Sequence, residues 1–201
     1  MRDSPKRLIH VPNAAGADEA GRGPLAGPVV AAAVVLPDGF DIAGIDDSKK
    51  LDAKTREELA VRIRSVALFA VERADPDEID RLNILWASMA AMERSLFRLS
   101  PCPTYAYIDG NRLPRKLPCK GEAVVKGDGK YACIAAASIL AKVERDRIMT
   151  EYAIEFPEFG FEHHFGYPTP DHLEALRKHG PCPIHRRTFG PVRDFDQPGL
   201  F

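Results

Sequence analysis

The sequence contains few cysteines, and they lie far apart. Cys102, Cys119, Cys133 and Cys182 form no Cys-x-x-Cys pair, so the sequence does not favour a structural zinc site. They are typical of reduced thiols, and Cys133 is predicted to lie in the core. No apolar run approaches the ~20 residues that cross a membrane, and no apolar segment of a secretory signal follows the first seven residues. We therefore expect a cytoplasmic protein without a membrane partner.

The sequence also lacks an excess of charge of either sign. Its 28 lysines and arginines nearly balance 29 aspartates and glutamates, which leaves a formal net charge of −1. Attraction of the whole molecule to nucleic acid is therefore not expected, and contacts with phosphate groups have to come from local clusters of basic side chains. A glycine-rich turn near residue 21 is not followed by the Gly-Lys-Ser/Thr of a nucleotide-binding loop, which excludes that interpretation.

Internal repeats and low-complexity tracts are absent as well. A chain of 201 residues, 45% hydrophobic and 28% charged, is long enough for one domain with a substantial core. We predict a single domain over residues 1–201, in which 1–12 form a flexible lead-in and 190–201 a tail. Apolar alternation and turn residues predict strands at 14–18, 29–36, 67–73, 104–109 and 122–125. Apolar stripes and capping residues predict helices from about 52, from 76 to about 99, from about 131 to 155, and from 170 to 180.

The most informative stretch carries two adjacent carboxylates, Asp18 and Glu19, between an apolar run and the turn Gly21-Arg22-Gly23. Neighbouring side chains on a strand point to opposite faces, so the two acids can share a site only where the strand ends or twists. Glycine allows that change and leaves main-chain groups open to a ligand. Two like charges about 4 Å apart repel by roughly 4 kcal/mol at an effective dielectric near 20, and a hard cation would balance them.

For an acidic pair alone, a surface turn is the more frequent explanation. The flanking sequence weakens the explanation as a surface turn, because 29–36 has the pattern of a buried strand and the stretch does not resemble a solvated linker. The glycine and proline residues between the first two strands favour a return connection, so we expect these strands to pair antiparallel.

Two further acids stand at predicted strand exits. Asp109 ends one strand, and Asp128 follows another in Lys126-Gly127-Asp128. A lone acid there is more often a turn former, yet strand ends also present site residues in mixed α/β domains. Four oxygen ligands without a compact histidine or cysteine partner favour Mg²⁺ or Mn²⁺ over Zn²⁺. Two such ions roughly 3.5–4 Å apart would suit phosphodiester hydrolysis.

We expect the histidines and the charged residues of the long helix over 131–155 to have structural roles. His163, His164 and His172 have no compact ligand spacing, so we expect them to be solvated or hydrogen-bonded. This helix carries charged residues at i, i+3 and i+4 spacing, and we expect them to pair within it: Lys142, Glu144, Arg145, Asp146 and Arg147.

Several segments together resemble ribonuclease HII, the type 2 ribonuclease H. The resemblance begins with Gly-Ala-Asp-Glu-Ala-Gly-Arg-Gly-Pro-Leu-Ala-Gly-Pro at 16–28 and continues, in the order of that family, at 46–51, 108–111, 126–128, 134–147, 166–169 and 184–189. Each segment alone is a weak pattern, but the ordered set is specific. The chain differs from many relatives at Phe165, where a lysine is common.

The resemblance implies an α/β protein with a ribonuclease H-like fold, a mixed sheet flanked by helices. It implies an endoribonuclease that hydrolyses the RNA strand of RNA–DNA hybrids and incises 5′ to ribonucleotides embedded in duplex DNA, leaving 3′-OH and 5′-phosphate ends, as needed to excise ribonucleotides from DNA. Asp18, Glu19, Asp109 and Asp128 match the catalytic, metal-binding carboxylates of that family, with Mg²⁺ or Mn²⁺ as cofactor. We expect a monomer whose partners are hybrids and ribonucleotide-containing duplexes.

The 2′-OH distinguishes such a substrate from DNA. The resemblance implies that the main chain of Gly21, Arg22 and Gly23, together with Tyr167, holds this hydroxyl at an RNA–DNA junction. It also suggests phosphate contacts by basic and hydroxyl side chains that would otherwise be explained as solvated. The substrate-binding residues expected on these grounds are Gly21, Arg22, Gly23, Ser48, Lys49, Lys50, Tyr167 and Arg187.

Three alternatives remain. Ribonuclease HIII carries an added N-terminal domain and is disfavoured by the short segment before Asp18. Another carboxylate-metal nuclease of the same fold would not require Gly-Arg-Gly and Gly-Tyr. A hybrid-binding protein without catalysis is disfavoured by four site-like acids, which repel phosphates unless cations intervene.

Overall fold

The protein contains a five-stranded mixed sheet. A computed structural model describes residues 8–45, 48 and 51–195. The strands lie in the order β3-β2-β1-β4-β5, and β1 is antiparallel to β2 and parallel to β4. The bounds are β1 Ala14–Ala20, β2 Val29–Val35, β3 Leu68–Ala74, β4 Tyr105–Asp109 and β5 Lys120–Val124. Because β1 lies at the centre, its C-terminal end is enclosed by neighbours on both sides.

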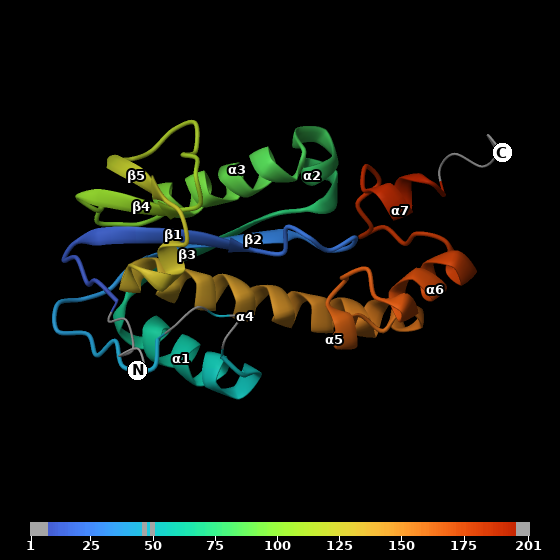
Figure 1. Cartoon of the computed structure of the whole chain (residues 1–201), viewed down its shortest axis with the longest axis horizontal. Coiled ribbons are helices and arrows are strands. Elements are labelled where there is room, and N and C mark those ends of the chain that lie inside the picture. Colours follow the sequence, from blue (N-terminus) through green and yellow to red (C-terminus); the bar gives the residue numbers. More distant parts are fainter. Residues whose placement is uncertain (1–7, 46–47, 49–50, 196–201) are drawn as a thin grey trace, which may run out of the picture.

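Helices cover both faces of this sheet (Figure 1). On one side, α2 (Pro76–Leu82) and α3 (Ile84–Phe97) bury apolar residues against β1, β2 and β4. On the other, α1 (Ala53–Val66) and the long α4 (Ala132–Glu155) pack over β2 and β1. Small residues permit this packing, since a Cβ on Gly16 of β1 would overlap the main chain of Cys133 in α4. The close approach brings polar residues of α4 next to the end of β1.

The C-terminal part packs on the far end of α4 (Figure 1). It consists of the 3-10 turn η2 (Pro157–Phe159) and helices α5 (Phe161–His164), α6 (Pro170–His179) and α7 (Gly190–Arg193). A cluster that includes Met149, Phe159, Phe161 and Ile184 holds it together, and an isolated antiparallel bridge pairs Ala26 with His185. Over the described ranges, no helix combines the length and apolarity needed to cross a membrane.

Most predicted elements are confirmed within one or two residues, including the antiparallel pairing of β1 with β2. The α/β class is confirmed as well. Thr169 caps α6 through the amide of His172, and Pro170 starts that helix as expected. Cys133 is buried, and burial raises the pKa of its thiol to about 12.

The prediction of one helix from 76 to 99 is wrong. The chain breaks at Asn83, whose φ of 64° lies in the left-handed region. Its side-chain oxygen accepts hydrogen bonds from the amides of Leu85 and Trp86, so Asn83 ends α2 and caps α3. Two short helices were also not predicted: α5 within the expected loop at 161–168, and α7 within the expected tail.

Candidate active site

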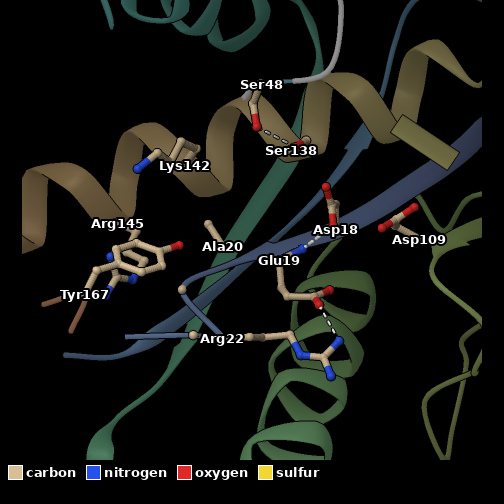
Figure 2. Close-up of a pocket in the computed structure, with 12 residues that line it drawn as sticks. Asp18, Glu19, Ala20, Arg22, Ser48, Asp109, Ser138, Lys142, Arg145 and Tyr167 are labelled. Carbon is tan, nitrogen blue, oxygen red and sulfur yellow. Dashed lines mark hydrogen bonds and ion pairs between the residues drawn. The ribbon is translucent and has the colours of Figure 1, made fainter. Parts of the chain in front are cut away.

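One cavity of about 350 Å³ lies where β1 ends beside α4. It contains many of the predicted site residues, drawn from segments far apart in the sequence (Figure 2). The predicted residues that line it are Asp18, Glu19, Gly21, Arg22, Gly23, Ser48, Asp109 and Tyr167. Three further lining residues, Ser138, Lys142 and Arg145, come from α4. The fold therefore gathers both predicted and unpredicted polar groups at this strand end.

Asp18 is the buried acid of the cavity, with a relative exposure of 6%. Its pKa is raised well above the ordinary value, first by burial and then by the neighbouring carboxylates of Glu19 and Asp109. A hydrogen bond with the Ser138 hydroxyl lowers the pKa of Asp18, and this hydroxyl is also 2.9 Å from the Ser48 hydroxyl. The Asp18 carboxylate also accepts a 2.7 Å hydrogen bond from the amide of Glu19. A buried anion surrounded by further acids is a favourable place for a cation.

Glu19 follows Asp18 on the same strand but points elsewhere. Its carboxylate is 3.1 Å from a guanidinium nitrogen of Arg22, and Figure 2 shows its side chain directed toward that arginine. The opposite orientation of adjacent strand residues explains the difference. The two acids thus line one cavity without presenting their oxygens to a common point.

Asp109 reaches the cavity from the neighbouring strand. Because Ala17 of β1 pairs with Ile108 of β4 in parallel register, the two strands deliver Asp18 and Asp109 at adjacent ends. The amide of Gly127 donates a 2.7 Å hydrogen bond to Asp109, which ties the turn η1 (Gly127–Gly129) to this carboxylate. Asp128 lies in that turn and accepts from the amide of Gly129 at 2.9 Å, but it is not among the cavity-lining residues.

Within the part of the chain that the structure describes, no three histidine, cysteine, aspartate or glutamate side chains are already arranged as ligands of one metal ion. The donor set nevertheless fits a hard divalent cation, because it consists of carboxylates and includes a buried acid with a raised pKa. Three of the four acids line the same cavity. That all four bind metal together remains a prediction.

Two buried arginines shape the loop between β1 and β2. Arg186 donates to the carbonyl oxygens of Gly21 at 2.6 Å, Arg22 at 3.0 Å and Gly27 at 2.9 Å. Arg145 donates to Pro28 at 3.1 Å and Ala26 at 3.2 Å on the same loop, and to Phe165 at 3.0 Å. Burial lowers the pKa of Arg145 to about 10 and that of Arg186 to about 9. Both buried guanidinium groups therefore bind main-chain oxygens and hold the loop in place.

The prediction of ion pairs within α4 is confirmed for Lys142–Asp146 and Glu144–Arg147. It is wrong for Arg145, whose side chain points into the loop. A sequence signal for this existed, because residues 138, 142 and 145 have i, i+4 and i+7 spacing and share one helix face. Gly21 permits the contact: its φ is +96°, and a Cβ there would overlap Nε of Arg145.

Tyr167 lines the side of the cavity away from Asp18 (Figure 2). A Cβ placed on Gly23 would lie 3.3 Å from the Tyr167 ring, so the ring and the glycine-rich turn face each other closely. Lys142 also lies at this side, with Nζ 5.0 Å from the centre of the Phe165 ring. A lysine is therefore present beside Phe165, but it comes from α4.

Three of the residues expected to bind substrate, Arg187, Lys49 and Lys50, are not among the described residues that line the cavity. Arg187 does not line the cavity; its amide donates to Asp80 at 2.8 Å, and its guanidinium approaches the carbonyl oxygen of Pro181 at 3.5 Å. The residue before it, Arg186, is the one that contacts the glycine-rich turn. Lys49 and Lys50 lie outside the described residues.

Comparison with known proteins gives consistent matches over most of the chain. A family model described as Ribonuclease HII matches residues 15–192. A Ribonuclease HII from Marinomonas sp. (strain MWYL1) is 60% identical over 180 residues, which cover 89% of this chain and 90% of the relative. The crystal structure of ribonuclease H2 from Pyrococcus horikoshii OT3 superposes with a TM-score of 0.75 at 31% identity, covering 91% of this chain and 96% of that one. Bst-RNase HIII in complex with Mn²⁺ shares the fold, with a TM-score of 0.71 at 20% identity over 90% of this chain and 68% of that chain.

Proposed function

The chain belongs to the ribonuclease HII family and is a type 2 ribonuclease H, and we propose that Asp18, Glu19, Asp109 and Asp128 bind the divalent ions on which its reaction depends. Enzymes of this family hydrolyse the RNA strand of RNA–DNA hybrids and cut 5′ to ribonucleotides embedded in duplex DNA. The observation that carries the assignment is the burial of Asp18 beside Glu19 and Asp109 in the cavity that also contains Gly21–Gly23 and Tyr167.

The carboxylates hold cations where the scissile phosphate would otherwise be repelled. Asp18 and Asp109 supply oxygens from adjacent strand ends, and the Gly127 amide orients Asp109 through its hydrogen bond. Glu19 joins them after its side chain leaves Arg22. Bound Mg²⁺ or Mn²⁺ supplies the positive charge that activates the attacking water and stabilises the leaving 3′ oxygen. Family membership gives divalent-metal dependence, and the Mn²⁺ complex of Bst-RNase HIII supports manganese as one usable ion.

Substrate selection is assigned to the glycine-rich turn and Tyr167. The main chain of Gly21–Gly23 can hydrogen-bond a ribose hydroxyl without contacting the base, so recognition does not depend on base identity. Arg145 and Arg186 keep the turn in place from beneath. Tyr167 confines the sugar from the opposite side. Arg22, Ser48 and Lys142 lie at the cavity and are the described groups best placed to contact phosphates.

A labelled duplex with a single ribonucleotide tests this assignment. With Mg²⁺ we expect one incision on the 5′ side of the ribose, and no incision in EDTA or with Asp109→Asn. An all-DNA duplex of the same sequence is the control and should remain intact. Equal cutting of the all-DNA duplex, or full activity of Asp109→Asn, would contradict the proposed site.

The proposal also covers the oligomeric state and the cellular location. We propose that the protein is a monomer, which light scattering of the purified protein would test. A cytoplasmic location is tested by cell fractionation. A dimer in solution or a membrane-bound pool would overturn these two points without affecting the assignment of the catalytic carboxylates.

A further inference from the structure

Three buried histidines form a cluster next to the main chain of Tyr167, and none of them lines the active-site cavity. His164 ends α5, His172 lies in the first turn of α6, and His185 lies in the segment that precedes Arg186. Their relative exposures are 8%, 0% and 1%. Burial of three imidazoles requires that their ring nitrogens find partners, and those partners connect the two elements proposed to hold the ribose.

The hydrogen bonds define the tautomers of His172 and His185. The Tyr167 carbonyl oxygen can only accept, so His172 Nδ1 donates to it at 2.9 Å. The Cys182 amide can only donate, so His185 Nδ1 accepts from it at 3.0 Å; the Cys182 thiol is also 3.0 Å from this nitrogen. The two Nε2 atoms are 3.1 Å apart, which leaves His185 Nε2–H as donor and His172 Nε2 as acceptor. The chain thus runs in one direction, from Cys182 through both imidazoles to Tyr167.

Both histidines are neutral in this arrangement. Burial first, and then the neighbouring imidazole, lowers the pKa of each to about 4: the neighbour of His172 is His164, stacked on it with ring centres 4.6 Å apart, and the neighbour of His185 is His172. His164 is itself satisfied, with Nε2 bonded to the Phe159 carbonyl oxygen and Nδ1 accepting from the Gly166 amide.

The other end of the same segment holds the glycine-rich turn. Arg186, directly after His185, donates to the carbonyl oxygens of Gly21 and Arg22. The segment is fixed along the turn by two main-chain bonds, from Gly27 to Ile184 and from Arg186 to Leu25. Residues 185 and 186 therefore connect to both ribose-binding elements, one through a guanidinium and the other through a histidine pair.

Tyr167 depends on such support. The residue is 44% exposed, so packing of the ring alone does little to define its position. The main chain defines it instead: the Tyr167 amide donates to the His164 carbonyl oxygen, and the Tyr167 carbonyl oxygen accepts from the Thr169 amide and from His172 Nδ1. A displacement of about 1 Å at a substrate-positioning group can reduce a rate by about 100-fold.

We propose that the His185–His172 hydrogen bond is a positioning link that sets Tyr167 at the correct distance from Gly21–Gly23, and thereby fixes how a ribose is held at the cleavage point. The inference rests on the proposed roles of these ribose-binding residues. Neither histidine touches substrate; both act through the main chain of Tyr167.

Two amide substitutions that differ by one methylene test the link. Gln can place an N–H near the position of imidazole Nε2, so His185→Gln keeps the donor to His172. Asn places its polar atoms near the position of Nδ1, so His185→Asn keeps the acceptor for Cys182 but breaks the link. We expect single-turnover cleavage of the single-ribonucleotide duplex to fall at least tenfold in His185→Asn, and His185→Gln to recover most of that loss.

A double-mutant cycle separates positioning from a general loss of structure. If the link acts through Tyr167, His185→Asn should have less than a twofold effect in a Tyr167→Ala background. Equal rates for the Asn and Gln variants, or a full tenfold effect in Tyr167→Ala, would overturn the proposal. Wild-type enzyme is measured in parallel: absence of a ribonucleotide-dependent incision there would refute the proposed function itself, which is a different result.

A measurement on the native side chains covers the case in which His185→Asn does not fold. Imidazole ¹⁵N spectra at pH 7 should show His172 protonated at Nδ1 and His185 at Nε2. In the Asp109→Asn protein, the single-ribonucleotide duplex should shift the His172 signals more than the all-DNA duplex does. The opposite tautomers, or equal shifts with both duplexes, would contradict the link.

Discussion

Glu19 and Arg22 form an ion pair of 3.1 Å at the edge of the active-site cavity. The same glutamate is a proposed metal ligand, and the same arginine is a proposed substrate contact. In the structure, the ion pair therefore keeps Glu19 from binding metal and Arg22 from contacting the substrate. Because Arg22 is about half exposed, the pair is screened by solvent and is worth at most about 1 kcal/mol.

Replacing Arg22 by an uncharged residue should change the affinity for metal and the affinity for substrate in opposite directions. In Arg22→Gln, Glu19 no longer competes with an ion pair, so the Mg²⁺ concentration for half-maximal cleavage should fall by about two- to fivefold. The KM for the duplex should rise, since a phosphate contact is lost. Arg98→Gln, which removes the ion pair of the exposed Arg98 with Glu72 of β3, is the control and should change neither quantity. An unchanged Mg²⁺ requirement would show that the pair does not oppose metal binding.

Asp18→Asn should stabilise the metal-free protein while abolishing cleavage. The wild-type carboxylate is buried beside two other acids, and neutralising it removes both the repulsion and the desolvation of a charge. We expect a gain of about 1–3 kcal/mol in the free energy of unfolding, measured by thermal denaturation in EDTA.

Metal addition provides the complementary measurement. Mg²⁺ should raise the melting temperature of the wild type but not that of Asp18→Asn, because ligand binding to the folded state is what stabilises it. Asp38→Asn, in an exposed loop, is the control. A lower melting temperature for Asp18→Asn in EDTA would be inconsistent with a strained acidic cluster.

Gly21→Ala should be far more damaging than the same replacement at another glycine with a positive φ. Gly39 also has a positive φ, of +75°, but nothing lies within 4 Å of a Cβ there, so Gly39→Ala should cost about 1 kcal/mol. At Gly21 the new methyl group would collide with Arg145 Nε in addition. We expect a larger loss of stability and a loss of ribonucleotide cleavage of at least tenfold, measured by urea denaturation and the duplex assay. Similar behaviour of the two variants would show that the Arg145 contact is unimportant.

The positions of Asp18, Asp109 and the strands that carry them could be predicted because they depend on local pattern. An apolar run followed by acids and glycine marks a strand end whatever the rest of the chain does. The break at Asn83 was missed because the apolar spacing continues through it, and only a left-handed asparagine reveals two helices. A helix-based interpretation gave Arg145 local partners, whereas its carbonyl partners lie 20 to 119 residues away in the sequence. Such pairings follow from tertiary packing.

The histidine pair should also make stability sensitive to acid. The pKa of His172 and of His185 is about 4 in the folded protein, against 6.5 for an unperturbed histidine. Between these values the unfolded chain binds protons that the folded protein does not, so the free energy of unfolding decreases as the pH falls from 6.5 toward 4. The effect is of the order of 3 kcal/mol for one histidine, and less than twice that for two residues that share a hydrogen bond.

Two other groups near the pair influence its titration. His164 adds to the depression for His172, and Arg187 does so for His185. Asp18 acts in the opposite sense, since its raised pKa favours the folded state on acidification. The comparison is therefore made between wild type and His185→Gln, in which Asp18 is unchanged. Urea denaturation at several pH values from 7 to 4.5 should give a smaller loss of stability in His185→Gln than in wild type. The exposed His163→Gln should behave as wild type, and equal slopes in all three proteins would mean that the buried pair is not what acid disrupts.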